Sequence, residues 1–178
     1  MFWRKSRLLI LYSTVDGHTK NICEYIKKKL KNRKSIHMSP IEEANDIVLK
    51  DFDEVVIGAS VRYGYHRKNL YKYILTNKDI LNNKKTVFFS LNLTARKPEK
   101  NSSSTNPYII KFLKKVDWNP TIKEVFAGRL DYPNLDFLNK LAILFIMVIT
   151  NGPKDISKTY ELTDWDKVDK LVNSIINI

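Results

Sequence analysis

The sequence predicts an α/β fold in which helices cover both faces of a five-stranded parallel sheet, a doubly wound arrangement. Short apolar segments rich in β-branched residues alternate with longer segments of helical periodicity along most of the 178 residues. The apolar segments are hydrophobic at nearly every position, as in strands that are buried on both faces. Such alternation is typical of parallel strands joined by helices. Segment 129–158 departs from it and is predicted to be a long insertion before the last helix.

The first half of the chain contains three predicted strands and two predicted helices. The first strand is continuously apolar, and the third is rich in β-branched residues, as expected for central strands. In the first helix, Ile22, Ile26 and Leu30 recur at helical spacing. The expected elements are, in order, a strand at Leu8–Tyr12, a helix at Thr19–Lys31, a weak strand at Ser35–Met38, a strand at Glu54–Ala59 and a helix at Asn69–Leu81.

The second half continues the pattern with two strands and two helices. These elements are a strand at Thr86–Leu91, a helix at Thr105–Lys115, a strand at Glu124–Gly128 and a last helix at Thr163–Asn177. Thr163 and Asp166 have the spacing of a capping box at the start of the last helix. Ligands of such sheets bind outside the carboxyl ends of the strands. We therefore expect the loops Ser13–Thr19, Ser60–His66 and Asn92–Lys100 to converge.

The composition, with 43% hydrophobic residues, fits one domain spanning residues 1–178. The single cysteine, Cys23, excludes a disulfide framework and indicates a reducing compartment, where we expect a packed thiol. No spacing of histidine and cysteine suggests a metal site. The net charge of +12 suggests nucleic acid or an anionic membrane as a partner. Because the basic residues are spread over many helices and no nucleic-acid motif is present, we expect no nucleic-acid partner.

Residues 1–7 are basic and resemble the start of a signal peptide. The apolar run that follows, Leu8–Tyr12, is too short for the hydrophobic region of such a peptide, and no small-residue cleavage site comes after it. We expect residues 1–7 to form a short basic N-terminal extension before the first strand.

An anion site is predicted where the first strand meets the first helix. Ser13, Thr14 and Thr19 supply hydroxyls around Gly17, and the helix adds free N–H groups and partial positive charge. The turn lacks the Gly-Lys-Ser/Thr of a P-loop and the three glycines of a dinucleotide fingerprint. A hydroxyl-rich turn suits a monoester phosphate and resembles the phosphate loop of flavodoxin-like proteins, which hold FMN. The alternative is an ordinary connection with Thr19 as the N-cap.

The insertion contains nine consecutive apolar residues, Leu141–Ile149. They are too few to span a bilayer, which needs about 20 residues. A helix that is apolar on all sides must be buried in protein or in lipid. The segment is therefore either a buried core element or a surface that meets a membrane or covers an apolar substrate.

Two further loops carry side chains suited to ligand binding. Residues 61–66 hold two tyrosines and a histidine, whose rings could stack on a flat heteroaromatic group. The loop 92–100 holds Arg96, Lys97 and Lys100, which could pair with carboxylates or phosphates. The alternatives are exposed aromatic side chains and a solvated basic loop.

Together these segments resemble the quinone-dependent protoporphyrinogen oxidases of bacteria, a family with a flavodoxin-like fold. The similarity runs from Leu8 to the last helix, and its most specific word is Ala-Arg-Lys-Pro-Glu-Lys at 95–100. Tyr65 and His66 depart from the order expected in the family, and the insertion is more apolar than expected. The other matching words are Ser13-Thr14, Asp16-Gly17, Thr19, Val56–Ser60, Arg62–Gly64, Asn92-Leu93, Thr105-Asn106, Tyr108, Lys111–Leu113, Trp118, Pro120, Ala127-Gly128, Leu130, Tyr132-Pro133 and Thr163–Trp165.

The resemblance implies an FMN enzyme that oxidises protoporphyrinogen IX in haem synthesis and passes electrons to menaquinone or ubiquinone. It also implies peripheral attachment to an anionic membrane surface, at the cytoplasmic face of the plasma membrane. Arg96, Lys97 and Lys100 are expected to face the substrate, and no side chain is required as a general base. The residues expected to hold FMN are Ser13, Thr14, Val15, Asp16, Gly17, His18 and Thr19 at the phosphate, and Ser60, Val61, Arg62, Tyr63, Gly64, Asn92, Leu93, Thr94, Ala95 and Arg96 at the ring.

Three other functions are compatible with parts of the sequence. A flavodoxin-type electron carrier or quinone reductase would share the fold and FMN, although carriers that shuttle between proteins are usually acidic. A nucleic-acid-binding domain would account for the charge but needs a basic face with base-reading groups. A relative without flavin would share only the fold.

Overall fold

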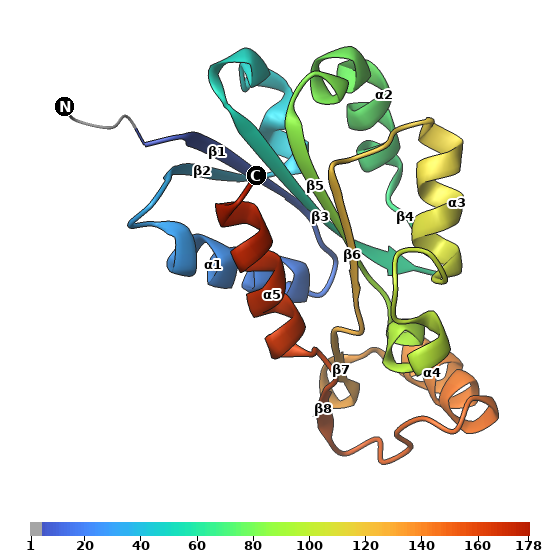
Figure 1. Cartoon of the computed structure of the whole chain (residues 1–178). Helices are drawn as coiled ribbons and strands as arrows, with labels where there is room; N and C mark the ends of the chain where they lie inside the picture. The colour runs from blue at the N-terminus through green and yellow to red at the C-terminus, as the bar shows by residue number, and fades with distance from the viewer. Residues whose placement is uncertain (1–4) are drawn as a thin grey trace.

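A computed structural model describes residues 5–178 and contains a five-stranded parallel sheet in the order β2-β1-β3-β5-β6 (Figure 1). All neighbouring strands in this order run parallel, and the order reverses between β1 and β3. The predicted flavodoxin-like, doubly wound sheet is thereby confirmed. Its strands are β1 Arg7–Ser13, β2 Ser35–Pro40, β3 Glu54–Arg62, β5 Lys85–Leu91 and β6 Ile122–Phe126.

Four helices cover the two faces of the sheet. Helices α1 (His18–Leu30) and α5 (Trp165–Ile176) lie together on one face. Helices α2 (Lys68–Asn82) and α3 (Pro107–Val116) lie on the other face (Figure 1). Of the predicted N-terminal extension, residues 1–4 lie outside the described part of the chain, and Arg7 already belongs to β1.

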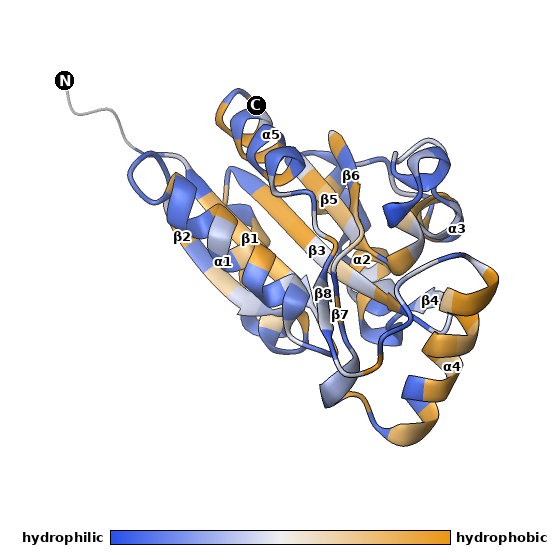
Figure 2. Cartoon of the chain, turned by 90° about the horizontal axis from the view of Figure 1, so that it is seen from below, coloured by the Kyte–Doolittle hydropathy of each residue, from blue (hydrophilic) through white to orange (hydrophobic). Residues whose placement is uncertain are grey.

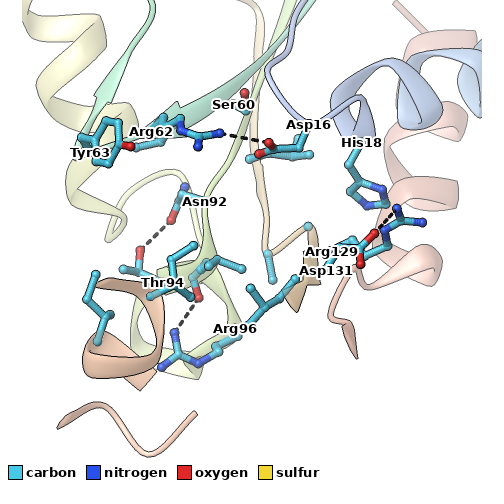
Figure 3. Close-up of a pocket in the computed structure, with 18 of the residues that line it drawn as sticks. Asp16, His18, Ser60, Arg62, Tyr63, Asn92, Thr94, Arg96, Arg129 and Asp131 are labelled. Carbon is cyan, nitrogen blue, oxygen red and sulfur yellow. Dashed lines mark hydrogen bonds and ion pairs between the residues drawn. The ribbon is translucent and has the colours of Figure 1, made fainter. Parts of the chain in front are cut away.

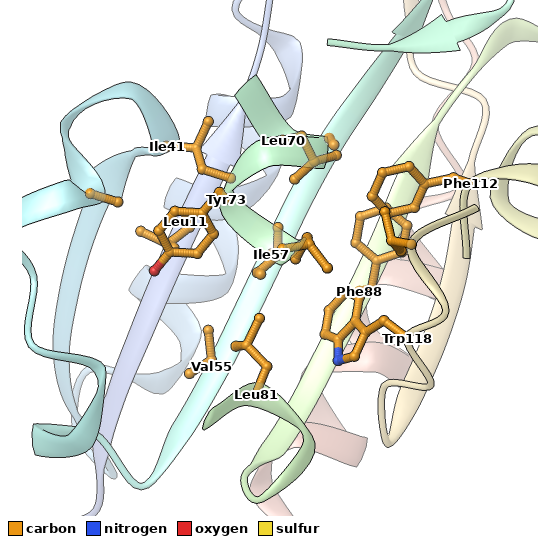
Figure 4. Packing of buried hydrophobic residues seen from close by; sticks show 14 of the residues in the cluster. Leu11, Ile41, Val55, Ile57, Leu70, Tyr73, Leu81, Phe88, Phe112 and Trp118 are labelled. Atoms are coloured by element: carbon orange, nitrogen blue, oxygen red, sulfur yellow. The ribbon is translucent and has the colours of Figure 1, made fainter. Parts of the chain in front are cut away.

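The core consists of two hydrophobic clusters separated by the sheet. Along β1, Leu9 and Leu11 belong to the cluster under α2 and α3, whereas Leu8 and Ile10 belong to the cluster under α1 and α5. Successive strand residues point to opposite faces, which explains why the strands are hydrophobic at nearly every position. Figure 4 shows the first cluster, in which aromatic rings pack closely. The Phe88 ring lies 5.0 Å from that of Phe112 and 5.8 Å from that of Trp118. The predicted packed thiol, Cys23, is buried in the second cluster, where burial raises its pKa.

The structure corrects the prediction that residues 60–66 form a loop. Strand β3 extends to Arg62, and the two-residue strand β4 (Tyr65–His66) pairs with it antiparallel. Tyr63 and Gly64 form the tip, with φ values of 51° and 81°. The chain turns back because His66 is buried, with its ring 4.7 Å from that of Phe112 and its Nε2 2.9 Å from the Ser90 hydroxyl.

The predicted capping box at the last helix is wrong. Asp164 caps α5 by accepting a hydrogen bond from the Lys167 N–H. The Thr163 hydroxyl instead bonds the His18 ring at 2.8 Å, so a long-range partner replaces the local one. Strand β6 also ends at Phe126 rather than at Gly128, and Asn106 caps α3.

The insertion and the residues directly after it form a two-stranded antiparallel sheet and a helix. Strands β7 (Arg129–Asp131) and β8 (Thr159–Glu161) pair with each other, and α4 (Phe137–Ile149) lies between them in sequence. A core element is excluded, because Met147 is the only buried residue of α4, while Leu138 and Phe145 are 77% and 67% exposed. None of the helices between residues 5 and 178 is long and apolar enough to cross a membrane.

Gly58 should be essential for the packing of the central strand. A Cβ atom at this position would lie 2.2 Å from Cζ of the buried Phe89 ring. We expect Gly58→Ala to lower the free energy of unfolding by about 1–3 kcal/mol, measured by urea denaturation. A leucine at position 89 is smaller than phenylalanine and would relieve the clash with the new Cβ. Gly58→Ala should therefore destabilise the Phe89→Leu variant much less than it destabilises the wild type. Equal effects in both backgrounds would contradict this explanation.

Candidate functional site

A pocket of about 620 Å³ lies at the carboxyl edge of the sheet, where the three predicted loops converge with the insertion (Figure 3). Fifteen of the predicted site residues line it: Thr14, Asp16, His18, Thr19, Ser60, Val61, Arg62, Tyr63, Gly64, Asn92, Leu93, Thr94, Arg96, Lys97 and Lys100. The arrangement follows from the parallel sheet, which brings the ends of β1, β3 and β5 to one edge.

The turn between β1 and α1 presents polar atoms that have no partner among residues 5–178. Gly17 precedes the helix with φ at 78°, and no side chain caps the helix, so Thr19 is not the N-cap. The hydroxyls of Ser13, Thr19 and Ser60 and the Nδ1 atom of His18 are buried without a hydrogen-bond partner. Buried polar groups are normally satisfied, and leaving one unsatisfied costs about 1–3 kcal/mol. These atoms and the uncapped helix start fit an oxygen-rich anion such as a phosphate.

Two arginines fix the conformation of this turn. Arg62, near the tip of the β3–β4 hairpin, forms an ion pair with Asp16 at 2.9 Å. Arg67 follows β4 and donates a hydrogen bond to the Thr14 carbonyl at 3.1 Å. The hairpin therefore supports the turn directly, which sequence reasoning did not foresee for Arg67.

His18 connects the turn to the insertion. Its Nε2 lies 2.8 Å from the Thr163 hydroxyl and 3.6 Å from a carboxylate oxygen of Glu161. Burial lowers the pKa of His18, Glu161 opposes that effect, and Arg129 adds to it. The sequence pattern contained no signal for these contacts, because they join residues more than a hundred positions apart.

A buried amide network shapes the loop after β5. Asn92 and Asn106 exchange side-chain hydrogen bonds at 2.9 and 3.3 Å, and Asn106 also donates to the Lys100 carbonyl at 2.9 Å. The Thr94 hydroxyl donates to the same Asn92 oxygen. The protein's own hydrogen bonds therefore hold the loop, which contains short helical turns at Leu93–Arg96 and Pro98–Lys100.

The cations of this loop differ in their surroundings. Arg96 is half-buried and donates to the carbonyls of Leu93 and Thr150 and to the Thr150 hydroxyl. Lys97 and Lys100 line the pocket, and neither forms an ion pair within residues 5–178. The two lysines are thus the side chains of the loop available to an incoming anion.

Helix α4 supplies an apolar wall that the sequence did not predict in detail. Ala142, Ile143, Ile146 and Met147 line the pocket. Figure 2 shows that α4 is hydrophobic along most of its length. Several of its apolar side chains, among them Leu138, Phe145 and Ile149, are exposed to solvent. The other lining residues that sequence reasoning missed are Leu91, Tyr108, Ala127, Gly128, Arg129, Leu130, Asp131, Asn134, Leu135, Asn139 and Thr150.

Four predicted site residues do not line the pocket. Ser13 ends β1 with a buried hydroxyl, and Ala95 packs in the core. The Val15 side chain is exposed, and Gly17 has none. The backbone groups of Ser13, Val15 and Gly17 remain predicted contributors to the anion site, and Ala95 remains predicted at the ring.

Comparisons with known proteins support the fold. Residues 9–157 match the family model of a flavodoxin domain. A Leishmania major protein named protoporphyrinogen IX dehydrogenase (quinone) is 40% identical over 164 residues, 91% of this chain and 71% of the relative. An Escherichia coli K12 protein of the same name is 34% identical over 173 residues, 97% of this chain and 96% of the relative. Oxidised flavodoxin 2 from Bacillus cereus superposes with a TM-score of 0.50 at 19% identity, over 82% of this chain and 99% of that chain.

Proposed function

The chain belongs to the flavodoxin-domain family of protoporphyrinogen IX dehydrogenases (quinone), and we propose that it works with FMN as its flavin. It oxidises protoporphyrinogen IX to protoporphyrin IX and passes the electrons to a quinone. The Leishmania relative extends this family beyond the bacteria that the sequence resemblance named. The observation that carries the choice of FMN is the pair of unpartnered buried hydroxyls at Thr19 and Ser60, both of which line the pocket.

The residues of the pocket fit a flavin that ends in a single phosphate. The hydroxyls and the start of α1 would hold the phosphate, and the β3–β4 hairpin and the loop after β5 would flank the ring. A dinucleotide would need a glycine-rich fingerprint that this turn lacks. When bound, the flavin would supply the redox chemistry between substrate and quinone, and this chain's residues supply binding and orientation.

The rest of the pocket suits the two reactants. Conversion of the porphyrinogen to the porphyrin removes six hydrogen atoms, so three quinones are reduced to quinols in each complete oxidation. Ala142, Ile143 and Ile146 form an apolar wall of the pocket, which would reduce the access of water to the reacting faces. Lys97 and Lys100 provide positive charge for the substrate's propionates. We propose menaquinone or ubiquinone as the acceptor, because both combine a flat ring with an apolar tail.

We further propose that the outer face of α4 meets an anionic membrane surface, with the protein attached peripherally. Phe137, Leu138, Phe145 and Ile149 are exposed on this helix. Large apolar side chains that are exposed together often mark an interaction site. A membrane also holds the quinone, and lysines near an anionic surface each contribute about 1 kcal/mol of attraction.

The enzymatic proposal is tested with purified protein. We expect flavin absorption bands, release of FMN on denaturation, and formation of fluorescent protoporphyrin from protoporphyrinogen IX only when a quinone is added under anaerobic conditions. An electron carrier would bind FMN but fail to turn over the porphyrinogen. A colourless protein that cannot be reconstituted with FMN would contradict the proposal.

The phosphate site is tested by Thr19→Val, which removes one buried hydroxyl with little change in shape. We expect FMN binding to weaken by about 1–3 kcal/mol, because the anion loses a donor, as measured by fluorescence titration. Thr105→Val is the control, since that hydroxyl bonds only Ser102 at the surface. Unchanged FMN affinity in Thr19→Val would place the phosphate elsewhere.

The membrane proposal is tested by Leu138→Glu combined with Phe145→Glu. Both side chains are largely exposed, so the fold should persist. We expect loss of most co-sedimentation with phosphatidylglycerol vesicles, because the glutamates oppose both insertion and the anionic surface. The control is Leu75→Glu, an exposed position on α2. Wild-type binding by the double variant would refute docking through α4.

A further inference from the structure

Arg96 belongs to a basic loop beside the pocket, yet its guanidinium is already engaged by the protein. We propose that Arg96 is a positioning residue that fixes the C-terminal end of α4 over the pocket, rather than a ligand of the substrate. The inference rests on the proposed function, since it assigns α4 to the wall of that site.

The contacts of Arg96 join two segments that are distant in sequence. Nη1 donates to the Leu93 carbonyl at 2.8 Å, which holds the side chain against its own loop. Nη2 donates to the Thr150 carbonyl at 3.3 Å and to the Thr150 hydroxyl. Thr150 is the C-cap of α4, so the guanidinium sits at the negative end of the helix dipole. Hydrogen bonds from a charged donor are stronger than neutral ones.

The end of α4 is built to accept this side chain. Asn151 follows the C-cap in a left-handed conformation, with φ at 50°, and the Gly152 N–H bonds the Met147 carbonyl at 2.7 Å. This closes the helix as a Schellman motif. A Cβ at Gly152 would lie 3.0 Å from Nη2 of Arg96 and 2.3 Å from the Met147 sulfur. Glycine therefore lets the backbone pass close to the guanidinium.

A second polar contact holds the opposite end of the helix. The Tyr63 hydroxyl at the hairpin tip donates to the Asn139 side-chain oxygen at 2.5 Å in the first turn of α4. Tyr63 is 75% exposed, so this contact is open to water, whereas Arg96 is half-buried. Between the two contacts, Met147 is the only buried side chain of the helix.

The middle of helix α4 packs through Met147, Ile143 and Leu144 against Leu130 and Tyr132. The Arg96 anchor fixes the C-terminal end of the helix, beyond this cluster. The helix's inner residues Ala142, Ile143 and Ile146 line the pocket only while the helix lies against the loop after β5. Releasing the anchor should let water reach the ring end of the flavin site. The anion site at Ser13 and Thr19 should be unaffected, because it lies on other elements.

The test uses Thr150→Val, which removes an acceptor of Arg96 but leaves every cation of the loop in place. In the flavin-loaded protein we expect about tenfold faster hydrogen exchange of the amides at 143–149, since one charge-assisted hydrogen bond is worth about that factor or more. Quenching of flavin fluorescence by iodide should increase, kcat should fall, and the FMN dissociation constant should stay unchanged. Arg96→Lys should show the same changes, because lysine cannot bridge Leu93 and Thr150 with a planar fork.

The matched control is Lys97→Gln, a neighbouring pocket cation. It should raise KM for the porphyrinogen and leave the exchange of α4 unchanged. If Thr150→Val exchanges like the wild type, or if Arg96→Lys raises KM alone as Lys97→Gln does, Arg96 does not anchor the helix. If the wild type fails to oxidise protoporphyrinogen while Thr150→Val still shows faster hydrogen exchange in α4, the proposed function is wrong, but the positioning role of Arg96 is supported.

Discussion

The parallel pairing of β1 with β3 is the constraint on which the rest of the structure depends. Its register places Ser13 opposite Ala59, and the next pairs set Ser60 opposite Leu91 and Leu91 opposite Phe126. The last residues of β1, β5 and β6 therefore form one row with Ala59 and Ser60 of β3, and β3 continues two residues past this row to Arg62. Because both faces are covered by helices, this edge is the place where loops can be polar without disturbing the core. The turn, the hairpin and the basic loop meet there for that reason.

The insertion adds to this edge what the sheet alone cannot supply. The sheet and its four covering helices provide polar loops that can bind a phosphate and enclose a flavin ring. They provide no large apolar surface for a hydrophobic reactant such as the porphyrinogen or the quinone. Helix α4 provides that surface on its inner side and repeats it on its outer side. The apolar side chains on the outer side of α4 contribute no hydrophobic stabilisation to the isolated protein, because they are not removed from water. The proposed membrane contact would explain these exposed side chains, because lipid would cover the outer side of α4.

The strands and the four covering helices could be predicted because their signals are local. Apolar runs of β-branched residues and helical spacing are contained within each segment, and the turn at Ser13–Thr19 carries its own hydroxyls. The errors arose where distant residues decide. Thr163 has the spacing of a helix cap, yet its hydroxyl bonds His18, and His66 draws residues 60–66 into a hairpin by entering the aromatic core. The extent to which α4 is buried could not be predicted either, because a run of apolar residues does not indicate which sides of a helix are covered by the protein.

Charge can matter at this site only where it is close to the ligands. At about 0.1 M salt, charges further apart than about 10 Å in water are largely screened. The lysines at 27–29 lie exposed on α1, and Lys29 is already paired with Asp169, so most of the +12 net charge is a general property of the surface. Lys97 and Lys100 differ because they line the pocket without a carboxylate partner among the described residues. Arg96 is the third cation of the same loop, but its donors face Leu93 and Thr150. One short loop thus divides its positive charge between attracting anions and holding the apolar wall that those anions approach.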